Sequence, residues 1–194
     1  MAQSIFIFHG TAGYPGENWF PWMKEKLEAD GCDVFVPQFP TPEGQSFAAW
    51  IEVLKPLMSK INQDTILIGH SLGGIFTLKL LETLDHPIKA AVLVGTPIGE
   101  GRVKNYEPDK AFAGFDFNWD KIKSSASRFL VYQSDNDPYV GLENGQNLAK
   151  HLGADLTFIP NAGHFNKAAG YLKFDELYAK LKPLVPVVAP FTGL

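Results

Sequence analysis

Short, almost wholly apolar runs alternate along the chain with longer segments in which apolar residues recur every three or four positions. The short runs are typical of strands that are buried on both faces, and the longer segments are typical of helices with one buried side. The sequence predicts strands at residues 5–8, 33–37, 65–68, 89–94, 129–132 and 155–159, and helices at residues 19–29, 46–61, 75–84, 142–152 and 174–184. This alternation predicts an α/β fold: a three-layer sandwich with a mostly parallel sheet of about six strands.

Local signals mark the ends of the first two helices. Asn18 is a candidate N-cap for the first helix, and Gly31 is a candidate stop after it. Ser46 opens the second helix, which Pro56 is expected to kink or split. Helical spacing favours core positions over pocket positions for three tryptophans: Trp19, Trp22 and Trp50.

Residues 98–120 interrupt the alternation. They are polar, contain glycine and aromatic residues, and have no clear period. A loop of this length in a compact domain is usually functional, so we expect a short cap-like insertion there. Residues 185–194 are expected to form a tail that is interrupted by prolines. The expected organisation is a single domain over residues 1–194 with a small or absent cap.

Composition excludes several function classes. The chain has 194 residues, 45% of them hydrophobic and 20% charged, as in ordinary globular proteins. With a net charge of −4 and no basic run, the chain offers no positively charged segment that would bind nucleic acid or anionic membranes. Cys32 is the only cysteine, so neither a disulfide framework nor a Cys/His metal site is expected. With no targeting segment recognised, we expect a cytoplasmic protein without a metal or an organic cofactor.

Gly69-His70-Ser71-Leu72-Gly73 follows the third predicted strand and precedes a helix. This is the context of a nucleophile elbow, in which a tight turn presents the serine hydroxyl at the top of a sheet. Side chains at the two glycines would collide with neighbouring backbone. An incidental serine in a glycine-rich turn is the alternative interpretation, because Gly-x-Ser-x-Gly alone is common.

An acid and a base follow later strands at the same expected sheet edge. Asp137 follows the fifth strand and His164 follows the sixth. Serine needs a histidine to take its proton, and that histidine needs a carboxylate to orient it. Asp135 is the rival acid. The alternative interpretation of Asp137 is that it belongs to an ordinary Asp-Pro turn without a catalytic role. Four other histidines are less suitably placed as the base: His9, His70, His86 and His151.

Two backbone N–H groups are candidates for an oxyanion hole. Leu72 lies at the expected N-terminus of the helix after the elbow, where N–H groups are free. Thr11 lies in the loop after the first strand, which supplies the second donor in this architecture. A plain glycine-rich connection is an equally good interpretation of that loop. Neither Gly-x-Gly-x-x-Gly nor a Walker lysine is present, so nucleotide binding is discounted.

The order serine, aspartate, histidine resembles that of the α/β-hydrolase fold. More narrowly, the chain resembles the small serine hydrolases of the retinoblastoma-binding protein 9 and YdeN type. The matching segments are residues 68–71, 92–94, 117–122, 134–139 and 162–165, together with the start at a strand that leads into a Trp-bearing helix. The resemblance implies catalytic roles for Ser71, Asp137 and His164. It does not imply retinoblastoma-protein binding, because Cys32 is flanked by Gly31 and Asp33 and Leu-x-Cys-x-Glu is absent.

The expected function is therefore hydrolysis of small soluble carboxylic esters through an acyl-enzyme, with a small-molecule acyl substrate as the partner. A thioesterase, an amidase or an acyltransferase would use the same three residues. A non-catalytic binding protein on a hydrolase scaffold would not require all three. Haloalkane dehalogenases and epoxide hydrolases need a carboxylate at the elbow, which Ser71 excludes.

Overall fold

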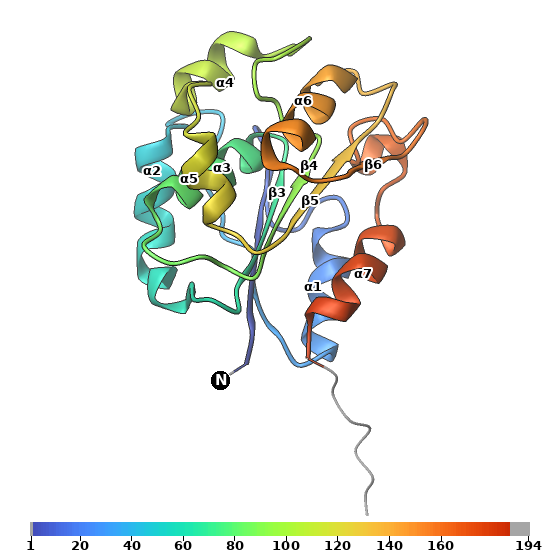
Figure 1. Cartoon of the computed structure of the whole chain (residues 1–194). Coiled ribbons are helices and arrows are strands. Elements are labelled where there is room, and N and C mark those ends of the chain that lie inside the picture. The colour runs from blue at the N-terminus through green and yellow to red at the C-terminus, as the bar shows by residue number, and fades with distance from the viewer. Residues whose placement is uncertain (1, 187–194) are drawn as a thin grey trace, which may run out of the picture.

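A computed structural model describes residues 2–186 and contains one open sheet in which every strand pair is parallel (Figure 1). The strand order is β2-β1-β3-β4-β5-β6. The strands are Ser4–Phe8 (β1), Asp33–Phe35 (β2), Ile66–His70 (β3), Ala90–Val94 (β4), Phe129–Gln133 (β5) and Leu156–Phe158 (β6). Each predicted strand is present, so the predicted α/β fold with a parallel sheet of about six strands is confirmed. The first strand, β1, lies inside the sheet between β2 and β3, and the last strand, β6, lies at one edge.

The α-helices of the described chain connect these strands or follow them. They are Phe20–Ala29 (α1), Phe47–Leu54 (α2), Leu72–Thr83 (α3), Tyr106–Ala113 (α4), Trp119–Ser124 (α5), Leu142–Leu152 (α6) and Asp175–Leu181 (α7). Short 3₁₀ segments lie at Lys55–Lys60 (η1), Lys167–Ala169 (η2) and Lys182–Leu184 (η3). Pro56 lies in the first turn of η1, so the second predicted helix is split where the sequence predicts.

Alternate residues of the strands face two separate hydrophobic cores, which makes the molecule a three-layer sandwich. Phe6, Leu67 and Leu93 face the core beneath α2, α3, α5 and α6. Ile7, Ile68 and Val92 face the core beneath α1 and α7. Figure 1 shows these two helical layers on either side of the sheet. Burial on both faces explains why the strands are continuous apolar runs.

The predicted core tryptophans differ in burial. Trp19 and Trp50 are fully buried, one in each core, as the spacing predicts. Trp22 is half-buried and packs against Tyr178, with ring centroids 5.8 Å apart. Trp50 stacks on Phe39 at 4.3 Å and contacts Phe112 edge-on at 4.8 Å. These contacts attach α4 to the rest of the molecule.

Two predictions about local structure are wrong. Trp19, not Asn18, is the N-cap of α1, and no side chain caps that helix. Asn18 instead accepts a hydrogen bond from the Lys167 N–H at 2.8 Å. Residues 98–120 are not without regular structure, because they contain α4 and the start of α5. Helix α4 lies beyond the carboxyl ends of the strands (Figure 1).

The predicted tail falls largely on residues 187–194, which lie outside the described residues. Among helices in the described part of the chain, none has both the length and the apolar character needed to span a bilayer.

Candidate active site

Ser71 lies in the turn between β3 and α3, with φ 55° and ψ −122°. Residues other than glycine rarely adopt this conformation, and its cost is accepted mainly at functional sites. The turn is tight at both predicted glycines. A Cβ at Gly69 would collide with the Gly73 carbonyl oxygen, and a Cβ at Gly73 would collide with that of Phe8. Ser71 therefore lies at a tight strand-to-helix turn, in a backbone conformation that is rare for serine.

Asp137 and His164 form a buried pair. The His164 Nδ1 atom lies 2.7 Å from Asp137 Oδ2, and the two side chains are 8% and 0% exposed. The other carboxylate oxygen, Oδ1, accepts the N–H groups of Tyr139 at 2.8 Å and Val140 at 3.0 Å. These bonds fix the carboxylate in the loop after β5. The acid therefore lies where it can hold the Nδ1–H tautomer of His164.

Ser71 and His164 line one cavity of about 300 Å³ at the carboxyl edge of the sheet. Thr11 lines it as well, from the loop after β1. No hydrogen bond joins the Ser71 hydroxyl to His164 within the described residues. Catalytic hydrogen bonds are often long before a substrate binds, so a shared cavity is the relevant geometry. The structure thus brings Ser71, His164 and, through its contact with His164, Asp137 to one place.

Neither His70 nor His9 is available as the base. Burial, together with the nearby His164, lowers the pKa of His70 to about 3. Its neutral ring donates Nε2–H to the His164 carbonyl oxygen at 2.8 Å. The His9 ring lies 2.9 Å from the Gly10 carbonyl through Nδ1 and accepts the Phe39 N–H through Nε2 at 3.1 Å. His86 and His151 do not line the cavity.

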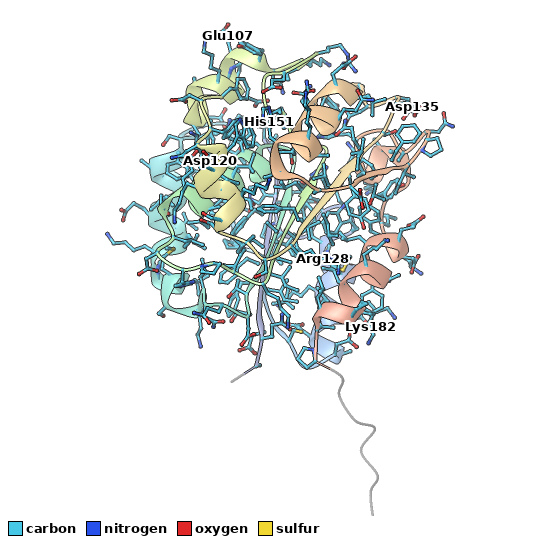
Figure 2. All side chains as sticks on the ribbon, in the orientation of Figure 1. Glu107, Asp120, Arg128, Asp135, His151 and Lys182 are labelled. Carbon is cyan, nitrogen blue, oxygen red and sulfur yellow. The ribbon has the colours of Figure 1, made fainter. Side chains whose placement is uncertain are left out.

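Asp135, the rival acid, takes part in a different arrangement. Its exposed carboxylate accepts the Asn161 N–H at 2.8 Å, which holds the pKa of that carboxyl below its usual range. Ser134 Oγ accepts the Ala162 N–H at 3.0 Å, and Asn136 Oδ1 accepts the Gly163 N–H at 2.7 Å. We call these three acceptors, Ser134, Asp135 and Asn136, the loop ladder. Figure 2 shows Asp135 at the molecular surface.

The loop ladder joins the loop that carries Asp137 to the loop that carries His164. Three consecutive side chains before Asp137 bind three consecutive backbone N–H groups before His164. Asp135 therefore contacts the loop of the base and not its ring. The sequence contains the ladder residues, but only their pairing with the distant loop gives them this role.

The two oxyanion candidates have free backbone donors. Neither the Leu72 N–H nor the Thr11 N–H is a donor in the turn, loop and cap hydrogen bonds of the described backbone. Leu72 is the first residue of α3, where the helix dipole favours negative charge. Gly10, beside Thr11, approaches Ser71 so closely that a Cβ there would lie 2.8 Å from the serine Cβ.

Sequence reasoning missed two carboxylic acids in the cavity wall. Glu17 precedes α1, and Asp109 lies in α4. Burial raises the pKa of Glu17, and it raises that of Asp109 to about 7. The signal for Asp109 was its spacing of three from Phe112, which places both on one helix face. Within the described residues, no three His, Cys, Asp or Glu side chains are grouped so as to hold a metal ion.

Comparison with known proteins identifies the class to which this fold and site belong. A model of the serine hydrolase family matches residues 5–183, so the chain belongs to that family and is a hydrolase. Bacillus subtilis YdeN is 28% identical over 92% of this chain and 94% of its own length. The crystal structure of the ydeN product has a TM-score of 0.87 to this chain, covering 94% and 98% of the two chains at 26% identity.

Two further similarities are more distant. The rat serine hydrolase RBBP9 is 26% identical, with 91% of both chains covered. Est1E of Butyrivibrio proteoclasticus, solved with ferulic acid bound, has a TM-score of 0.67 over 93% of this chain and 90% of its own. At 16% identity this last likeness concerns the fold alone. The predicted resemblance to the RBBP9 and YdeN type is confirmed.

Proposed function

We propose that this chain hydrolyses small soluble carboxylic esters through an acyl-enzyme on Ser71. The observation that carries the proposal is the buried His164–Asp137 pair, 2.7 Å between Nδ1 and Oδ2, in the wall of the cavity that contains Ser71. A buried carboxylate on one ring nitrogen leaves the other free to accept the serine proton.

In the first half-reaction, Ser71 Oγ attacks the ester carbonyl carbon while His164 Nε2 takes the hydroxyl proton. The carbonyl oxygen becomes an oxyanion, which the N–H groups of Leu72 and Thr11 stabilise. When the C–O bond to the alcohol breaks, His164 returns its proton to the leaving alkoxide. Asp137 stabilises the imidazolium without taking its proton.

In the second half-reaction, His164 removes a proton from water, whose oxygen attacks the acyl carbon. The second oxyanion collapses, the bond to Ser71 Oγ breaks, and the serine regains a proton from His164. The products are a carboxylic acid and an alcohol. The cavity of about 300 Å³ and its polar lining favour short, polar acyl groups over long alkyl chains.

The experiment that tests the proposal is labelling with a fluorophosphonate probe, comparing the wild type with Ser71→Ala. We expect rapid labelling of the wild type and none of the variant, because the probe reacts with an activated serine. A folded wild-type protein that resists the probe contradicts the proposal and favours a non-catalytic binding protein.

The same residues could serve a thioesterase, an amidase or an acyltransferase. Comparing kcat/KM for an ester, a thioester and an anilide of the same acyl group distinguishes a thioesterase and an amidase from an esterase. Addition of a second alcohol separates the third, because an acyltransferase diverts the acyl group to that alcohol. We expect the highest kcat/KM for the ester, with water as the acceptor.

A further inference from the structure

The catalytic cavity has an acidic and polar wall. Glu17 and Asp109 line it, together with the amides of Asn18, Asn105 and Asn166. Neither lysine nor arginine is among its described lining residues. An acyl pocket for alkyl chains would be lined mainly by apolar side chains. This wall instead suits a ligand that donates hydrogen bonds.

Asp109 is placed as a core residue although it is a carboxylic acid. It is 6% exposed and lies three residues before Phe112, which packs edge-on against Trp50. No salt bridge or side-chain hydrogen bond within residues 2–186 involves its carboxyl group. The oxygens of this carboxyl are not among the fully buried side-chain atoms without a partner in residues 2–186, so they reach the cavity, and a perturbed acid in a cavity marks a candidate functional site.

Electrostatics agree with this placement. Burial raises the pKa of Asp109 to about 7, and His164 acts in the opposite direction. Asp109 is therefore close enough to the catalytic histidine for the two charges to interact. A donor group on a bound substrate would replace the hydration that burial removes from the carboxylate.

A second cavity distinguishes the acyl side of the site from the alcohol side. This cavity, of about 280 Å³, shares His164, Tyr139 and Asn166 with the first but does not include Ser71 or Asp109. The acyl carbon bonds to Ser71, and the leaving alcohol takes its proton from His164. The acyl group therefore belongs in the cavity that contains Ser71, beside Asp109.

We propose that Asp109 is a specificity-determining residue that binds a hydrogen-bond donor, a hydroxyl or an ammonium group, on the acyl part of the substrate. The inference rests on the proposed esterase function and names its substrate class. The acidic wall also disfavours acyl groups that carry a carboxylate.

The test uses 4-methylumbelliferyl esters of four acids of similar size: butyric, 3-hydroxybutyric, 3-aminobutyric and succinic acid, the last as its monoester. In the wild type we expect kcat/KM for the hydroxyl and ammonium esters to exceed that for butyrate by about tenfold or more, with the hemisuccinate slowest. Asp109→Ala should remove both preferences. Asp109→Asn should retain the preference for the hydroxyl ester and lose that for the ammonium ester.

Glu107→Gln is the matched control, because Glu107 lies in the same helix, is exposed, and extends away from the molecule in Figure 2. It should leave all four rates unchanged. Labelling of each variant with the fluorophosphonate probe reports a folded, activated Ser71 independently of acyl preference. Equal preferences in the wild type and in labelled Asp109→Ala overturn the inference alone, as does an unchanged preference for the ammonium ester in labelled Asp109→Asn. Failure of the wild type to label overturns the proposed function and the inference with it.

Discussion

At the scale of single residues, the two aspartates after β5 have separate roles. Asp137 is buried against the His164 ring, whereas Asp135 is exposed and binds a backbone N–H. The sequence could not separate them by position alone, since they are two residues apart. The structure separates them by what each carboxylate contacts.

Asp137→Asn should lower kcat by about 10³- to 10⁴-fold, because an amide can hold His164 in the wrong tautomer. Asp135→Asn should change kcat less than about threefold, since the amide oxygen can still accept the Asn161 N–H. Steady-state hydrolysis of an activated ester measures both. Full activity in Asp137→Asn beside a collapse in Asp135→Asn would reverse the assignment.

Asp109 gives a second prediction at this scale, in stability. Well below pH 4 its carboxyl is protonated in both the folded and the unfolded chain. As pH rises towards 7, the unfolded chain loses this proton first, so the folded state loses stability until its own pKa of about 7 is passed. Asp109→Asn lacks this loss. Its free energy of unfolding relative to wild type should rise by about 2–4 kcal/mol between pH 4.5 and pH 8.5.

Urea unfolding of the wild type and Asp109→Asn at both pH values measures that change. The comparison is a difference between variants, so the other titrating groups near the cavity, Glu17 and His164, largely cancel. Glu107→Gln provides the control, with a relative stability that stays nearly constant. A constant difference for Asp109→Asn would mean that its carboxyl is not buried as described.

At the scale of elements, the loop ladder couples the loop after β5 to the loop after β6. Asn136→Ala removes the acceptor of the Gly163 N–H, next to His164. We expect the rate of fluorophosphonate labelling to fall about tenfold or more, because small displacements of a catalytic group are costly. Asn136→Asp keeps the Oδ1 acceptor and should restore most of the rate.

The labelling rate is the suitable measurement because Asn136 also lines the second cavity, where it could alter KM for a large alcohol. A merely structural role would lower the stability of Asn136→Ala without changing the labelling rate of the folded protein. Thermal unfolding measured beside labelling distinguishes the two roles.

The four inner strands could be predicted because nearly all of their residues are buried, and most helices could be predicted because each has a regular apolar face. Helix α4 could not, since only Asp109 and Phe112 among its residues are buried, which gives no apolar stripe. Asn18 was misread as a cap because its partner, the Lys167 N–H, lies 149 residues away. The nomination of Ser71, Asp137 and His164 follows from chain order and strand ends. The acidic cavity wall depends on tertiary packing, which no local pattern encodes.

At the scale of the whole molecule, one sheet separates two cores and belongs to both. Trp50 lies in one core and Trp19 in the other. Trp19 also donates its Nε1–H to the Phe165 carbonyl at 3.0 Å, which attaches α1 to the loop of the base. Loss of packing in either core should therefore destabilise the whole sheet.

Trp50→Ala and Trp19→Ala should each lower the free energy of unfolding by about 3–5 kcal/mol, as expected for a large buried side chain. Each variant should unfold in a single transition. Far-ultraviolet circular dichroism and tyrosine fluorescence should report the same midpoint. Two separated transitions would contradict the expectation of a single domain over the chain.

The position of β6 has a consequence for synthesis on the ribosome. Within residues 2–186, this strand of three residues pairs only with β5, and its following loop carries His164. Ser71 thus leaves the exit tunnel more than ninety residues before His164. Under the proposed mechanism, a nascent chain therefore has its nucleophile but not its base until β6 pairs with β5 and the loop ladder forms. We expect no ester hydrolysis by the chain before that last strand is in place.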